Sequence, residues 1–132
     1  MTKNIAKLVG IGITALIGTA AWAGAKNYDP VSIDLGTDRA SGSLGDARNS
    51  ADTRQFIGCS ITTFVGSAPT LGCFAYDVSG TFFACSSTNS DLMATARSIT
   101  TDSTITFTRY PGTSICASLS VVNASHGAPK QP

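Results

Sequence analysis

Glutamate is absent from the 132-residue sequence, so all eight acidic side chains are aspartates. Charged residues make up only 13% of the chain, and the formal net charge is +1. The sequence contains no run of lysines and arginines. Nucleic acid binding depends on clustered basic side chains that neutralise phosphates. The sequence therefore predicts no nucleic acid partner.

Histidine occurs once, as His126, and this scarcity limits the catalysis that the chain can perform. A serine or cysteine nucleophile usually needs a rigidly placed histidine base, whereas His126 lies in a polar C-terminal segment. Asp77, near Tyr76 and Phe82, is the best candidate acid if apolar neighbours raise its pKa. Aspartate before Ser-Gly is also a routine turn residue. We therefore expect neither His126 nor Asp77 to be catalytic.

The cysteine and aspartate spacings lack the usual metal and redox motifs. The sequence has no Cys-x-x-Cys pair, no closely spaced zinc knuckle and no Asp-x-Asp-x-Asp calcium loop. We therefore expect no metal and no cofactor. An even number of cysteines in a small exported chain indicates a disulfide framework instead. The four cysteines are Cys59, Cys73, Cys85 and Cys116.

The first 23 residues have the layout of a secretory signal peptide. Lys3 and Lys7 precede an uncharged stretch over 8–21, and Ala21-Trp22-Ala23 is a small-x-small cleavage site. The uncharged stretch is short for a membrane span, which needs about 20 mainly apolar residues. We predict that 1–23 is cleaved and that the product is secreted or periplasmic, without a membrane anchor. Loss of the two lysines changes the formal charge from +1 to −1.

The remaining chain is rich in Ser, Thr and Gly, which suits strands and turns. We predict a mostly β fold: a small antiparallel sheet or sandwich of about five to six strands with one short helix. The expected strands are 31–35, 53–65, 71–78, 81–86, 103–110 and 115–123, and the expected helix is 91–98. The segment over 36–49 has no sustained apolar period and is expected to be an extended loop. A short helical turn around 46–52 is the alternative at its end, where Arg48 and Asp52 have a pairing spacing of four.

This pattern divides the chain into four parts. Residues 1–23 are the signal peptide, and 24–52 form an extended N-terminal segment and loop. Residues 53–123 form a disulfide-stabilised β domain, and 124–132 form a flexible tail. The strands at 53–65, 71–78 and 81–86 follow one another through short turns, so we expect them to form a three-stranded meander.

The cysteine pairing depends on the hairpin turns. A loop over 64–68 places Cys59 opposite Cys73, which favours a bond between them and leaves Cys85 with Cys116. A two-residue turn at Ser79-Gly80 turns Cys73 and Cys85 to opposite faces, whereas a three-residue turn over 78–80 places them opposite each other. Ser-Gly fits either turn, so the other two pairings stay open.

Two surface features remain after this assignment. Six aromatic residues on the meander are expected to be mainly core: Phe56, Phe64, Phe74, Tyr76, Phe82 and Phe83. Adjacent Phe82 and Phe83 must point to opposite faces, so at least one of them lies on the second face, where it either meets the helix or is exposed. If exposed, Phe82 and Tyr76 are the candidate partner-binding patch. The alternating threonines of "TITFT" (104–108) predict a row of hydroxyls that could meet sugar or ice, and that is also the ordinary wet face of a half-buried strand.

The runs "ASGSLGDARNSADTRQFIGC" (40–59), "GCFAYDVSG" and "ACSS" resemble a group of small, uncharacterised bacterial secreted proteins. The resemblance implies export and a bacterial source, and it implies no activity. We therefore expect a noncatalytic binding or interaction module whose partner is a protein, a glycan or the cell envelope. A structural or self-assembling surface protein is the alternative, and a small secreted hydrolase is the second alternative.

Overall fold

The computed structural model describes residues 24–129. The predicted signal peptide, 1–23, lies outside the described residues. None of the helices within 24–129 has the length and apolar character needed to cross a membrane.

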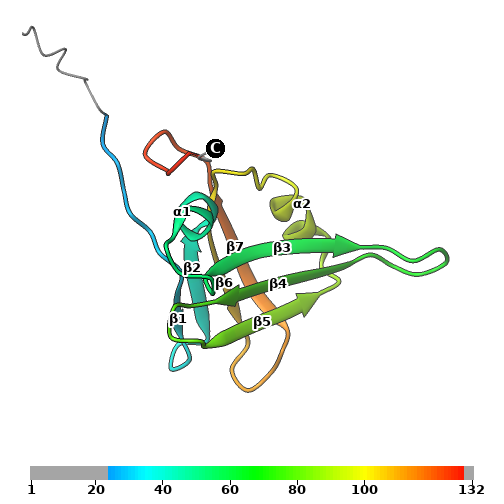
Figure 1. Ribbon diagram of the computed structural model, residues 1–132. Coiled ribbons are helices and arrows are strands. Elements are labelled where there is room, and N and C mark those ends of the chain that lie inside the picture. The colour runs from blue at the N-terminus through cyan, green and yellow to red at the C-terminus, as the bar shows by residue number, and fades with distance from the viewer. Residues whose placement is uncertain (1–23, 130–132) are drawn as a thin grey trace, which may run out of the picture.

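The chain folds into two antiparallel sheets that pack against each other and cross steeply (Figure 1). The four-stranded sheet contains, in spatial order, β1 (Ser32–Asp34), β2 (Arg39–Ser43), β6 (Thr104–Arg109) and β7 (Cys116–Val122). The three-stranded sheet contains β3 (Phe56–Thr62), β4 (Thr70–Tyr76) and β5 (Phe82–Ser87). The helices are α1 (Leu44–Asn49) and α2 (Ser90–Ala96). The predicted mostly β, disulfide-stapled fold is confirmed.

The expectation of a loop over 36–49 was wrong, because this segment forms β2 and α1. Strand β2 lies between β1 and β6, and its Ala40 is fully buried. At Gly42, an added Cβ would lie only 3.0 Å from the Cα of Val31. Small residues in β2 therefore allow the chain to approach closely at Val31. Because β2 has few large apolar side chains, its sequence lacks the apolar alternation by which a strand is usually predicted.

Helix α1 follows β2 directly and is fixed by a capping bond. The Ser43 Oγ accepts a hydrogen bond from the Asp46 N–H at 3.2 Å, which is the usual N-cap arrangement. The carboxylate of the buried Asp46 accepts from the Asp29 N–H at 2.9 Å. The Asp46 bond attaches the segment before β1 to the helix. Residues 24–52, expected to be an extended segment and loop, thus contain β1, β2 and α1.

The predicted meander of β3, β4 and β5 is confirmed, and its register answers the turn question. Tyr76 pairs with Phe82, so the loop between them closes over three residues, 78–80, and Gly80 has a φ of 91°. The Asp77 carboxylate accepts from the Thr81 N–H at 2.9 Å and closes this turn. Glycine is needed at the positive φ because a side chain there would be strained.

The disulfides have the preferred pairing, Cys59 with Cys73 and Cys85 with Cys116. The register places Cys73 opposite both Cys59 and Cys85, so all three lie in one row on the inner face of the meander. Cys59–Cys73 joins two neighbouring strands of one sheet, whereas Cys85–Cys116 joins β5 to β7 and so connects the two sheets.

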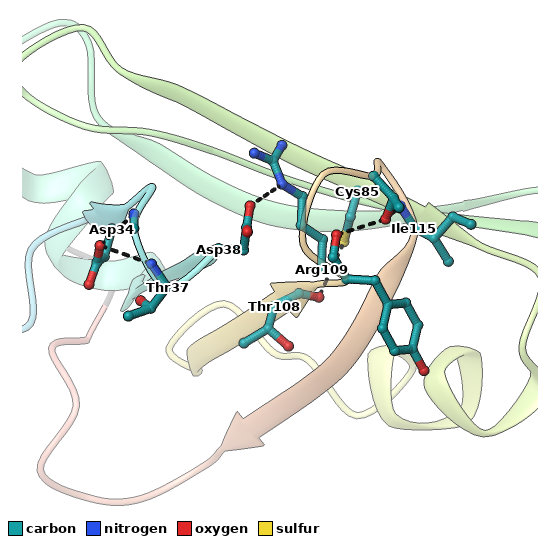
Figure 2. Close-up of polar contacts among 10 residues, drawn as sticks. Asp34, Thr37, Asp38, Cys85, Thr108, Arg109 and Ile115 are labelled. Carbon is teal, nitrogen blue, oxygen red and sulfur yellow. Dashed lines mark hydrogen bonds and ion pairs between the residues drawn. The ribbon is translucent and has the colours of Figure 1, made fainter.

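The core between the sheets is centred on two aromatic rings. Phe83 of β5 and Phe107 of β6 are at most 1% exposed, and their ring centroids lie 5.5 Å apart. The Arg109 guanidinium lies 4.3 Å from the Phe83 ring centroid and donates to Asp38 at 2.7 Å (Figure 2). This ion pair holds the turn between β1 and β2, where Asp38 has a φ of 50°, against the end of β6.

The segment after β7 lies against the body over the residues that the structure describes. The Asn27 N–H donates to the His126 carbonyl at 3.1 Å, and the Asn49 side-chain amide donates to the Pro129 carbonyl at 3.0 Å. A Cβ at Gly45 of α1 would collide with the Ala128 carbonyl. Residues 124–129, predicted as part of a flexible tail, are therefore attached to α1 and the N-terminal segment.

We expect the turn before β3 to make the free energy of unfolding fall at acid pH. Asp52 accepts from the Gln55 side chain and from the N–H groups of Gln55 and Arg54, and these bonds lower its pKa from 3.8. Gln55 in turn accepts from the Val31 N–H at 2.9 Å. Because the folded pKa is depressed, the stabilisation is present above about pH 4 and is lost as the pH falls further.

Urea unfolding of wild type and Asp52→Asn from neutral pH to about pH 2 tests this expectation. The difference in free energy of unfolding should be constant above about pH 5 and should shrink below about pH 4. A difference that stays constant down to the lowest pH would contradict this role for Asp52.

Candidate binding surface

The strands of the three-stranded sheet contain no charged residue. Asp77 is the single charged residue between Arg54 and Asp91, and its carboxylate closes the turn after β4. The Arg54 guanidinium lies at the same end of the sheet, because a Cβ at Gly80 would be 3.8 Å both from it and from the Tyr76 hydroxyl. A ligand on the outer face of the strands therefore meets apolar, hydroxyl and backbone groups, with Arg54 and Asp77 at one end.

Four aromatic rings lie together at one end of this face. The register places Phe56, Tyr76 and Phe82 in one row across the three strands, and Phe74 lies next to this row. The Phe56 and Tyr76 rings stack with centroids 5.6 Å apart and planes at 11°, and Tyr76 lies 6.2 Å from Phe82. Phe56 also contacts Phe74 edge-on at 5.8 Å. We call these four residues the aromatic face.

The aromatic face is open to solvent, in contrast to the core on the other side of the sheet. Phe82 is 56% exposed and Phe56 is 42% exposed, whereas the adjacent Phe83 is 1% exposed. Tyr76 and Phe74 are half-buried among their neighbours. The expectation that the meander aromatics are mainly core was wrong: of those six, Phe83 alone is a core residue.

The structure places the predicted patch residues, Tyr76 and Phe82, side by side on this face. It adds Phe56 and Phe74, which we had assigned to the core. The predicted pairing of Cys59 with Cys73 already implies that Phe56 lies opposite Tyr76, and the period of two along β4 places Phe74 on the same face. The two turn lengths left open only which residue of β5, Phe82 or Phe83, lies opposite Tyr76.

The candidate catalytic residues have structural partners. Asp77 closes the loop between β4 and β5, as a turn residue does. His126 is half-buried beyond the end of β7, and its backbone carbonyl accepts from Asn27. Within 24–129, no three His, Cys, Asp or Glu side chains are grouped so that they could hold a metal ion.

The outer face of the four-stranded sheet is polar. Thr104, Thr106 and Thr108 point outward, while Ile105 and Phe107 between them are fully buried, so the threonine row is the wet face of a half-buried strand. Two shallow hollows of about 580 and 370 Å³ lie over β1, β2 and β6. Their shared residues are Ser32, Arg39 and Ser41.

Asp34 is the last residue of β1 and lines the larger hollow. Figure 2 shows its carboxylate beside Thr37. The Thr37 hydroxyl and the N–H groups of Gly36 and Thr37 donate to its carboxylate and lower its pKa. The carboxylate is therefore stabilised in its charged form by its own turn. This is the opposite of the raised pKa that a general acid needs at neutral pH.

Comparison with protein-family models, with curated proteins and with solved structures returned no match for this chain. The predicted resemblance to bacterial secreted proteins therefore stays a prediction. The function has to be inferred from the surfaces of the protein itself.

Proposed function

We propose that the protein is a noncatalytic binding module, secreted or periplasmic, whose aromatic face contacts an uncharged surface of a protein, a glycan or another envelope component. The observation that carries this proposal is the exposure of Phe56 and Phe82 beside Tyr76 on a sheet whose three strands contain no charged residue. Exposed apolar patches of this kind mark interaction sites more often than scattered apolar residues do.

The rings are arranged for binding before a partner arrives. Tyr76 contacts both Phe56 and Phe82, and each ring projects from a different strand of one rigid sheet. Aromatic side chains have few rotatable bonds, so little conformational entropy is lost on binding. Aromatic residues also dominate the energetics of protein interfaces. The face therefore has the composition of a binding hot spot.

The compartment fits this proposal. Two disulfides and no free cysteine among the described residues indicate a chain that folds in an oxidising compartment. A binding module in the periplasm or outside the cell is consistent with these bonds. The four rings of the aromatic face carry no charge, so we expect the salt dependence of the affinity to be limited to a contribution from Arg54 beside Tyr76.

Replacing Phe82 with serine is the direct test of the aromatic face. We expect the variant to bind a purified envelope fraction at least about tenfold more weakly, as measured by co-sedimentation, because the most exposed ring of the aromatic face is lost. The matched control is Val122→Ser, which removes a 44% exposed apolar side chain from β7 in the other sheet. Thermal unfolding and near-UV circular dichroism should show that both variants keep the fold.

Equal binding by wild type and Phe82→Ser, with the fold intact, would contradict the proposed binding face. A turnover that is abolished by Asp77→Ala or His126→Ala in folded protein would instead support the hydrolase alternative. Neither residue belongs to the aromatic face, so the two outcomes are distinguishable.

A further inference from the structure

Arg54 lies at the same end of the three-stranded sheet as the aromatic face. It comes shortly before β3, whose first residue is Phe56. A Cβ at Gly80, in the turn after β4, would be 3.8 Å from the Arg54 guanidinium and 3.8 Å from the Tyr76 hydroxyl. The Arg54 side chain therefore reaches from the edge of the sheet to the turn between β4 and β5. Its positive charge lies beside the central ring of the aromatic face.

This positive charge has no partner among residues 24–129, where the Arg54 guanidinium forms neither an ion pair nor a side-chain hydrogen bond. The two aspartates at this end of the sheet are used by turns. Asp52 accepts from the Arg54 N–H at 2.8 Å, and Asp77 closes the turn after β4. Arg54 is exposed, and it is the only basic residue over 49–96. A single uncompensated guanidinium therefore flanks the rings.

A lone guanidinium beside apolar rings is suited to a carboxylate. Arginine presents its N–H donors in a planar fork that matches the two oxygens of a carboxylate. A phosphate group carries more negative charge and is commonly bound by a cluster of basic side chains, whereas Arg54 stands alone. The attraction between opposite charges is also stronger beside apolar groups than in open water. Arg54 therefore complements one carboxylate at the end of the aromatic face.

The arrangement of the rings favours a polypeptide over a stacked sugar. A sugar that binds an aromatic side chain lies flat on an open ring face. Tyr76 stacks on Phe56 with planes at 11°, and Phe82 lies on its other side at 6.2 Å. Neighbouring rings therefore flank both faces of Tyr76, and its edge is what remains for a partner. Apolar side chains can pack on ring edges, because the hydrophobic effect is not directional.

We propose that the partner of the aromatic face is a protein that presents an aspartate or glutamate carboxylate to Arg54 and an adjacent apolar side chain to Phe82 and Tyr76. This assignment rests on the proposed function of the aromatic face. The partner surface over the four rings stays uncharged, and the carboxylate lies beyond it, at the Arg54 end. Complementary charges orient a partner and disfavour one that presents a basic residue at this point. Arg54 is therefore the specificity-determining residue of the binding surface.

Co-sedimentation with a purified envelope fraction, at low and at high salt, compares wild type with Arg54→Gln. Glutamine keeps the backbone N–H that Asp52 accepts, so the turn before β3 is retained. We expect Arg54→Gln to bind at least about tenfold more weakly at low salt, and the difference to shrink at high salt, which screens the charges. The matched control is Arg39→Gln, which removes an exposed arginine from β2 in the other sheet and should bind as wild type does.

Arg54→Lys identifies the acidic group of the partner, because a carbodiimide joins a lysine amine to a carboxylate that it contacts. We expect mass spectrometry to find amide cross-links between position 54 and an aspartate or glutamate of an envelope protein. Arg39→Lys should give none. Cross-links that form only to a glycan, or binding that survives protease digestion of the envelope fraction, would overturn a protein partner.

The variants separate a failure at Arg54 from a failure of the whole surface. Weak binding by Phe82→Ser together with wild-type binding by Arg54→Gln would disprove the role of Arg54 and leave the aromatic face as a binding surface. Wild-type binding by both folded variants would contradict the proposed function as well.

Discussion

Replacing Cys85 and Cys116 together with alanine is expected to lower the free energy of unfolding by about 4 kcal/mol. This disulfide closes a loop with a sequence separation of 31 and is the covalent link between the sheets. Cys59–Cys73, with a separation of 14, closes a shorter loop inside one sheet, so its removal should cost about 3 kcal/mol. Net stabilities of domains are about 5–15 kcal/mol, so either loss is large.

Urea unfolding of both double variants, followed by circular dichroism, measures the two losses. The ranking is the informative result: the variant without the inter-sheet bond should be the less stable, and its sheets should separate more readily. A greater loss from Cys59→Ala with Cys73→Ala would contradict the view that Cys85–Cys116 is the main covalent support of the fold.

Phe83→Ala should destabilise the protein by about 3–5 kcal/mol, the range for removing a buried aromatic side chain from a core. Phe83 is 1% exposed, packs on Phe107 across the sheets and supports the Arg109 guanidinium. Its neighbour Phe82 provides a matched control because it is 56% exposed on the opposite face. Phe82→Ala removes an exposed ring and its contact with Tyr76, so it should lower the free energy of unfolding by less than about 1 kcal/mol.

The free energies of unfolding of these two variants, measured side by side, test which face of β5 is buried. Similar losses at both positions would mean that both faces of the meander are covered. In that case the aromatic face would be part of a core, and the proposed binding surface would be wrong.

The meander was predictable from sequence because its strands contain β-branched and aromatic residues and are separated by clear turn signals. The disulfide pairing was predictable only as a preference: the loop over 64–68 places Cys59 opposite Cys73, but Cys73 also lies opposite Cys85. Helix α2 was predictable from its cap: the Asn89 side chain accepts from the Asp91 and Leu92 N–H groups.

Strand β2 and helix α1 were not predictable in the same way. Their sequence, "RASGSLGDARN" (39–49), has the composition of a loop because small residues fit close approaches in the fold. Gly42 lies against Val31, and Gly45 lies against Ala128, a contact across most of the chain. Local propensity contains no information about such distant partners, and tertiary packing decided the structure.

The candidate surface was predictable only in part. Adjacent Phe82 and Phe83 showed that one ring had to lie on the second face of the sheet, but the sequence left open which one and whether it was exposed or met the helix. The choice depends on the three-residue loop over 78–80, which sets the register of the hairpin. Phe56, at the other edge of the sheet, lies on this surface through the register of β3 and β4, which the loop over 64–68 sets.

Hydroxyl-radical footprinting compares the aromatic face in the cells that make the protein with the same face in purified protein. The account predicts that Phe56, Tyr76 and Phe82 are oxidised less in the cells, because a partner covers them. Tyr28, which is 72% exposed outside this face, is the internal reference and should be oxidised equally in both samples. Equal oxidation of the three rings in cells and in purified protein would contradict the claim that the aromatic face binds a partner.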